Sequence, residues 1–166
     1  MEHGHRTDVP PSTWIREQDG ALVADAVPFQ TLAARFGTPL HVYSASEITR
    51  AFHAVDAALA GLPHMVCYAM KANGTPAILR LLAGLGAGID AVSGGEIAWA
   101  LGSGVPPERV VMSGVGKTDE ELILALSTGI RSIHAESASE LAVIEQLAQE
   151  RGVRARVGLA KEKEQT

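Results

Sequence analysis

The chain has 166 residues, 46% of them hydrophobic, which is enough for one core of ordinary size and does not require a second complete domain. The formal net charge is −5 and the Lys and Arg residues are scattered, so the composition excludes a basic surface for nucleic acid. The most apolar stretch, AILRLLAGLGAGIDAV, is interrupted by Arg80 and Asp90, and no secretory signal opens the chain. We therefore expect neither a membrane partner nor export.

Cysteine usage points to the compartment. The one cysteine, Cys67, cannot build a disulfide framework, and it lies in the apolar run MVCYAM. A thiol inside a buried strand favours packing over nucleophilic attack. We therefore predict a reducing, cytoplasmic location.

Residues 1–36 are expected to form an N-terminal leader that is partly disordered. Its opening, MEHGHRTDVPPST, is predicted to be a mobile tail, and the segment up to residue 38 is predicted to be mainly helix and loop. His3 and His5 have no partner ligands at a useful spacing, so no metal site is predicted.

A helix is predicted to begin after Ser44. Ser44 and Glu47 have the spacing of a capping box, in which the two side chains satisfy each other's backbone N–H groups. The apolar stripe expected on one face of this helix consists of Ile48, Phe52, Val55 and Leu59.

From about residue 64, β-rich runs recur at a spacing of roughly 22 residues, each followed by a helical pattern, as in a chain of βα units. These runs are apolar nearly throughout, which predicts parallel strands covered on both faces. The runs are MVCYAM, GIDAVS, RVVMSG, RSIHAES and VRARVGL.

The expected helix starts support the same units. Three have a Ser or Thr followed three residues later by Glu, and a fourth has Thr75 before Pro76. The three pairs are Ser93 with Glu96, Thr118 with Glu121, and Ser137 with Glu140. Two architectures accept this alternation, an open doubly wound sheet and part of a (β/α)8 barrel, and periodicity does not choose between them.

In either architecture the functional edge lies at the carboxyl ends of the strands. The polar residues and glycine at those ends are Lys71, Asn73, Asp90, Ser93, Ser113, Gly114 and Glu136. A partly desolvated lysine amine can attack a carbonyl and form a Schiff base, whereas a lysine that only reaches water has no such role. Position alone leaves both interpretations of Lys71 open.

The SGGE and SGVGKT turns place small residues where a strand passes into a helix. Backbone N–H groups can face an anion there, but each turn is equally typical of a helix cap. GKT also ends the phosphate loop of nucleotide hydrolases, yet Val111 replaces the glycine that should open that pattern. Nucleotide binding is therefore kept only as a competing hypothesis.

In order along the chain, several segments resemble the diaminopimelate decarboxylase family, which belongs to the fold-type III pyridoxal-phosphate enzymes related to alanine racemase and ornithine decarboxylase. The segments span about 120 residues, which makes the resemblance more specific than any one motif. They are GTPLHVYS, CYAMKAN, GIDAVSGGE, RVVMSGVGKTDEEL and HAESASEL.

The resemblance implies an α/β fold, a partial (β/α)8 TIM-type barrel of about five βα units over residues 37–159. The family adds a separate β domain to which the N-terminal segment contributes, and its members are homodimers. The resemblance also implies that Lys71 holds pyridoxal 5'-phosphate through a Schiff base and that Asp90 lies near the cofactor. Glu96 is likewise expected to bind the cofactor. The implied substrate is meso-diaminopimelate, which yields lysine and CO2.

Residues 160–166 depart from the family pattern. After VRARVGL the family continues with an arginine and Val-Asn-Pro, whereas this chain has Ala160 and ends in KEKEQT. We interpret this divergent tail as a frameshift or a truncated gene. The exposed edges of an unfinished barrel then predict a marginal fold, weak cofactor binding and little activity for the chain by itself.

Three other functions stay open. Two lie close to the resemblance, namely an ornithine- or arginine-type decarboxylase and a carrier of pyridoxal phosphate without catalysis. The third is a small nucleotide-binding or interaction module with a complete five-stranded parallel sheet.

Overall fold

The computed structural model describes residues 14–160, and the chain divides into two compact units, residues 1–51 and 52–166. The predicted mobile tail with His3 and His5 lies outside the described residues, as does the divergent end after Ala160. The division expected at residue 37 stays a prediction.

The first unit contains an antiparallel sheet. Strands β1 (Ile15–Gln18), β2 (Ala21–Ala24) and β3 (Val27–Pro28) pair in this order and are followed by helix α1 (Phe29–Phe36). The expectation of mainly helix and loop before residue 38 was therefore wrong. Its missed signal is Asp-Gly between two strands: Asp19 and Gly20 both have positive φ, at 52° and 73°, as a two-residue hairpin turn requires.

Helix α2 (Ala45–Ala58) begins as predicted, because the Ser44 Oγ accepts a hydrogen bond from the Glu47 N–H at 3.1 Å. The expected apolar stripe is only partly confirmed. Among the residues of α2 the structure buries only Phe52, Val55 is 50% exposed, and the helix ends before Leu59. Correct spacing therefore gave the helix but not the burial of its stripe.

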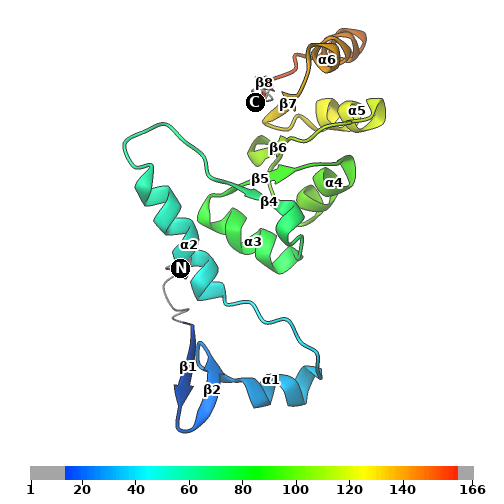
Figure 1. The fold of residues 1–166 in the computed structure, drawn as a ribbon. Helices are drawn as coiled ribbons and strands as arrows, with labels where there is room; N and C mark the ends of the chain where they lie inside the picture. The colour runs from blue at the N-terminus through cyan, green and yellow to red at the C-terminus, as the bar shows by residue number, and fades with distance from the viewer. Residues whose placement is uncertain (1–13, 161–166) are drawn as a thin grey trace, which may run out of the picture. The chain divides into compact units, whose positions relative to one another are not determined.

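In the described part of the second unit, five parallel strands pair in chain order (Figure 1). They are β4 (Cys67–Ala69), β5 (Gly88–Ala91), β6 (Val110–Met112), β7 (Ser132–Ala135) and β8 (Val157–Leu159). The helices between them are η1 (Met70–Ala72), α3 (Pro76–Leu85), α4 (Gly94–Gly102), η2 (Pro107–Arg109), α5 (Asp119–Thr128) and α6 (Ala138–Arg151). All five predicted strands are thus confirmed, and the first four are followed by the predicted helices; no helix follows β8 within the described residues. Strand order without a reversal is that of a barrel segment, not of a doubly wound sheet.

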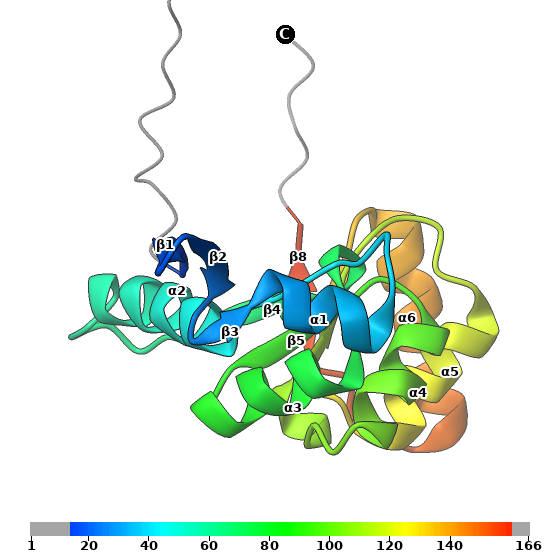
Figure 2. The ribbon, with the colours of Figure 1, turned by 90° about the horizontal axis from the view of Figure 1, so that it is seen from below.

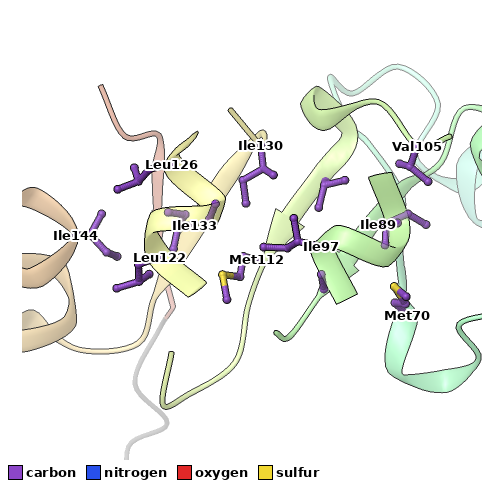
Figure 3. Close-up of a cluster of buried hydrophobic side chains, with 14 of the residues drawn as sticks. Met70, Ile89, Ile97, Val105, Met112, Leu122, Leu126, Ile130, Ile133 and Ile144 are labelled. Atoms are coloured by element: carbon purple, nitrogen blue, oxygen red, sulfur yellow. The ribbon is translucent and has the colours of Figure 1, made fainter. Parts of the chain in front are cut away.

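The core lies between the strands and helices α3 to α6, which cover one face of the sheet (Figures 1 and 2). Ile89, Met112 and Ile133 point from the strands toward Ile97, Leu122 and Ile144 on the helices (Figure 3). The expectation that both faces are covered is confirmed only in part, since β6 is buried on both faces but its neighbours are not. The opposite face carries the half-buried polar side chains of Cys67, Asp90, Ser132 and His134, because residues two apart on a strand share a face.

Glutamates in the first turns of the helices join neighbouring βα units. Thr118 and Glu121 form a complete capping box at the start of α5. The same Glu121 carboxylate also accepts the Gly94 N–H of the preceding unit at 2.8 Å. A Cβ at Gly94 would lie 3.0 Å from the Glu121 Cγ, so a side chain here would require the Glu121 side chain to shift. The predicted cap at Ser137 is confirmed by its hydrogen bond from the Glu140 N–H at 3.1 Å.

Lys117 makes a second connection between units. Its side chain is 1% exposed, and its amine donates to the carbonyl oxygens of Gly114 and His134, the latter at 2.8 Å. It also forms an ion pair at 3.1 Å with Glu140, whose side chain is 13% exposed. The Glu140 carboxylate in turn accepts the Glu136 N–H at 2.8 Å. The loop after β6, the end of β7 and the start of α6 are therefore held by one buried amine.

Lys117→Met is expected to lower the free energy of unfolding by about 3–5 kcal/mol, since it leaves the Glu140 carboxylate buried without its cation. The measurement is the urea midpoint. Lys71→Met is the matched control: this lysine lies at the same edge of the sheet but is exposed, so its loss should change stability by no more than about 0.5 kcal/mol. Equal effects of the two substitutions would contradict the structural role of Lys117.

His64, before β4, gives a pH-dependent prediction. Its Nδ1 lies 2.9 Å from the Leu62 carbonyl oxygen and its Nε2 lies 3.0 Å from Asp56 Oδ1. The carbonyl, and then the carboxylate, raise the pKa of His64 in the folded state. The stabilisation of the folded state by protonated His64 is therefore complete below the unfolded-state pKa of about 6.5. It is lost as the pH rises through the folded-state pKa of His64.

Asp56→Asn removes the negative charge and should bring the His64 pKa down toward its usual value, because the carboxylate favours the protonated ring. An NMR titration of the His64 ring protons in the two proteins measures this. An unchanged pKa would show that the pair does not form in solution.

Candidate functional site

Lys71 lies at the carboxyl edge of the sheet, in the 3₁₀ turn η1 directly after β4. Its neighbour Met70 is buried, while Lys71 is exposed. Within residues 14–160 no hydrogen bond or ion pair engages its amine. The sequence left open whether this lysine is partly desolvated or reaches water, and the structure has Lys71 exposed, where its amine is accessible to an aldehyde.

The backbone after Lys71 is fixed by side chains. Asn73 Oδ1 accepts the Thr75 N–H at 3.0 Å and the Thr75 hydroxyl at 2.6 Å. The Tyr68 hydroxyl, from β4, donates to the Asn73 carbonyl oxygen at 3.2 Å. These contacts hold the passage from Lys71 to helix α3, so Asn73, which the sequence marked as a strand-end residue, supports the turn.

Asp90 is the next predicted site residue, on the neighbouring strand β5. In the sheet it pairs with Ala69, two residues before Lys71, and with Val111. The Ser113 hydroxyl at the end of β6 donates to Asp90 Oδ1 at 2.6 Å. The structure therefore brings together Asp90 and Ser113 on the strands that follow β4.

Glu96 occupies the first turn of α4 with its carboxylate turned toward the backbone. Glu96 Oε2 accepts the Val92 N–H at 2.8 Å, and the Ser93 hydroxyl accepts the Glu96 N–H at 3.2 Å. The expected cap is thus present, with the carboxylate bonded one residue earlier than a strict capping box requires. In this position Glu96 holds the turn that follows Asp90.

The SGGE and SGVGKT turns are helix caps. The Glu121 carboxylate takes the N–H groups of Gly94 and Thr118, which a bound anion would otherwise need. A phosphate loop also requires its lysine to reach the phosphates, whereas Lys117 is buried and bonded to protein oxygens. These contacts remove the basis for nucleotide binding at this turn.

A cavity of about 570 Å³ lies on the sheet face opposite the helices, lined by Cys67, Asp90, Arg131 and His134 among others. Burial, and then the charge of Asp90, raise the pKa of the Cys67 thiol. A raised pKa disfavours the nucleophilic thiolate, in agreement with a packing role for Cys67. Gly158 leaves room for His134 here, because a Cβ would lie 2.7 Å from the His134 Cδ2.

Two kinds of site are not found in residues 14–160. No three side chains of His, Cys, Asp or Glu gather as metal ligands there. No described helix is both long and apolar enough to span a membrane.

Sequence reasoning missed the structural roles of two residues at the carboxyl edge of the sheet, where Lys71 lies. Lys117 was considered only as part of a phosphate-loop pattern, and its spacing of 23 residues from Glu140 is not a helical one. Trp99 was not singled out, although its indole N–H donates to the Gly74 carbonyl oxygen at 2.8 Å. Neither contact has a local signal, because each joins two successive βα units.

Comparison with known proteins identifies the relatives of this arrangement. The curated diaminopimelate decarboxylase of Pseudomonas aeruginosa is 45% identical over 142 residues, which are 86% of this chain and 34% of that protein. The crystal structure of AQ1208 from Aquifex aeolicus superimposes with a TM-score of 0.83 at 42% identity, covering 88% of this chain and 36% of that one.

A diaminopimelate decarboxylase from M. jannaschii, in complex with L-lysine, superimposes with a TM-score of 0.82 at 38% identity, covering 89% of this chain and 35% of that one. The chain thus spans about a third of the length of the relatives it matches. The resemblance and the partial barrel predicted from the motifs are confirmed.

The sequence profile described as pyridoxal-dependent decarboxylase, pyridoxal binding domain, matches residues 45–166, which is most of the chain. The chain belongs to the family of pyridoxal-dependent decarboxylases.

Proposed function

We propose that the chain is the lysine-bearing part of a pyridoxal-phosphate-dependent decarboxylase that converts meso-diaminopimelate to lysine and CO2. The observation that carries the proposal is the exposed amine of Lys71, which within the described residues has no partner and lies at the carboxyl end of β4. Barrel enzymes place their reacting groups at this edge. The names of the relatives support the substrate.

The proposed roles follow from the contacts. Lys71 would hold the cofactor through its aldehyde, since the Lys71 amine is accessible and within the described residues is not engaged by the protein. Asp90, oriented by the Ser113 hydroxyl, lines the same edge one strand away and contributes a carboxylate to the cofactor site. Glu96 accepts the Val92 N–H, and this hydrogen bond fixes the turn after Asp90. The bound cofactor supplies an acceptor for the electrons released as CO2 leaves.

The proposed substrate, meso-diaminopimelate, is more specific than the family assignment. The matching profile describes pyridoxal-dependent decarboxylases in general, so an ornithine- or arginine-type decarboxylase is the second candidate. Diaminopimelate is preferred because curated relatives from several bacteria, at 42–45% identity, are named for it. We also propose a cytoplasmic location, which rests on the free thiol of Cys67.

Pyridoxal phosphate followed by borohydride is expected to leave a pyridoxyl group on Lys71. Reduction makes the bond to the amine permanent, so weak binding is also detected, and peptide mass spectrometry gives the residue. Lys71→Ala should abolish this adduct. Lys117 is the internal control, since its buried amine should not react. An adduct spread over several lysines, or absent in the wild type, would refute the proposed role of Lys71.

Substrate choice can be measured with the same adduct. An amino acid that binds at the site displaces Lys71 from the cofactor, so it should protect Lys71 from reductive labelling. We expect half-protection at a concentration of meso-diaminopimelate about tenfold or more below that of ornithine, which is about 1.4 kcal/mol of preference. Equal protection would favour the second candidate.

A further inference from the structure

The side chain of Trp99 is held by a hydrogen bond, although it is not buried in the core. Trp99 lies on α4 and is 54% exposed, whereas Ile97 and Ala100 on the same helix are fully buried. Its indole Nε1 donates to the Gly74 carbonyl oxygen at 2.8 Å. The position of this ring is therefore set by a hydrogen bond to the loop that follows Lys71.

The partner residue, Gly74, is enclosed from two sides. A Cβ at this position would lie 3.2 Å from the Met70 Cε and 3.9 Å from the Trp99 Cδ1. Met70 is 4% exposed and directly precedes Lys71. The backbone from Met70 to Gly74 thus folds back over the Met70 side chain. Trp99, from the neighbouring unit, lies on the other side of Gly74.

Hydrogen bonds within the βα unit of Lys71, made by Tyr68, Asn73 and Thr75, fix the shape of this turn. Met70 packs the turn into the core that it shares with Ile89 and Ile97 of the next unit. Trp99 adds a directed hydrogen bond from α4, the helix whose first turn follows Asp90. The lysine and the aspartate proposed to share the site are thereby linked through α4.

We infer that Trp99 is a positioning residue for Lys71. By holding the Gly74 carbonyl it attaches the turn of residues 70–75 to α4 and keeps the Lys71 amine at one place relative to Asp90. Trp99 itself does not contact the reacting atoms. The role of this position in holding the cofactor rests on the proposed function. The attachment of the turn to α4 does not.

The test uses Trp99→Phe, which keeps an aromatic ring on the helix and removes the N–H donor. Trp14→Phe is the matched control, because it removes the other tryptophan, which lies in the first unit. Amide hydrogen exchange of peptides covering residues 68–78 needs no cofactor. One hydrogen bond predicts roughly two- to tenfold faster exchange in Trp99→Phe. Unchanged exchange, or an equal acceleration in Trp14→Phe, would overturn the inference.

The second measurement is the concentration of pyridoxal phosphate that gives half-maximal Lys71 adduct. Trp99→Phe should raise it by roughly two- to tenfold, whereas Trp14→Phe should leave it unchanged. An unchanged concentration in Trp99→Phe, or an equal rise in Trp14→Phe, would overturn the positioning role. If the wild type forms no adduct on Lys71, the proposed function has failed, and hydrogen exchange decides whether Trp99 holds the turn.

Discussion

Parallel pairing of β4 to β8 in chain order is the constraint on which the site depends. The register places Ala69, Asp90, Val111 and Ser132 side by side across four strands. Since parallel strands all end at the same edge, the turn after each strand is brought to that edge. Lys71 and Ser113 are far apart in the sequence, yet both lie at this edge because backbone hydrogen bonds between the strands hold the strand ends together. The helices only need to cover the opposite face of the sheet.

The turns at this edge are stabilised by charged side chains that bond to backbone groups. Glu121 accepts two of the free N–H groups at helix starts, those of Gly94 and Thr118. Glu96 and Glu140 instead accept the N–H groups of the residues that precede the caps, Val92 and Glu136. Two of these three glutamates also bond to the preceding unit, Glu121 through Gly94 and Glu140 through Lys117. These bonds thus fix neighbouring turns relative to one another in addition to the packing of the apolar core.

Much of this fold is predictable from local patterns, and the failures have a common cause. The strands and the caps at Ser93, Thr118 and Ser137 were predicted because each depends on residues within about one turn of helix or one strand. Burial is not local. Apolar runs look alike whether one or both faces are covered, so the half-exposed face with Asp90 was missed. The hairpin at Asp19 was locally encoded, but all four residues of the flanking strand Ile15–Gln18 lie at the surface, and the strand lacks an apolar pattern.

Two lysines at one edge show why position in a motif does not assign chemistry. Lys117 stands in a sequence typical of phosphate binding, yet its amine is enclosed by two carbonyl oxygens and a carboxylate. A primary amine must reach an aldehyde to bond it, and an amine enclosed by protein oxygens is not accessible to one. Lys71 has no such acceptors within the described residues. The difference between an enclosed lysine and an accessible one is therefore made by the acceptors around the amine. For Lys117 the His134 carbonyl oxygen and the Glu140 carboxylate come from the neighbouring unit, so they cannot be read from the lysine's own motif.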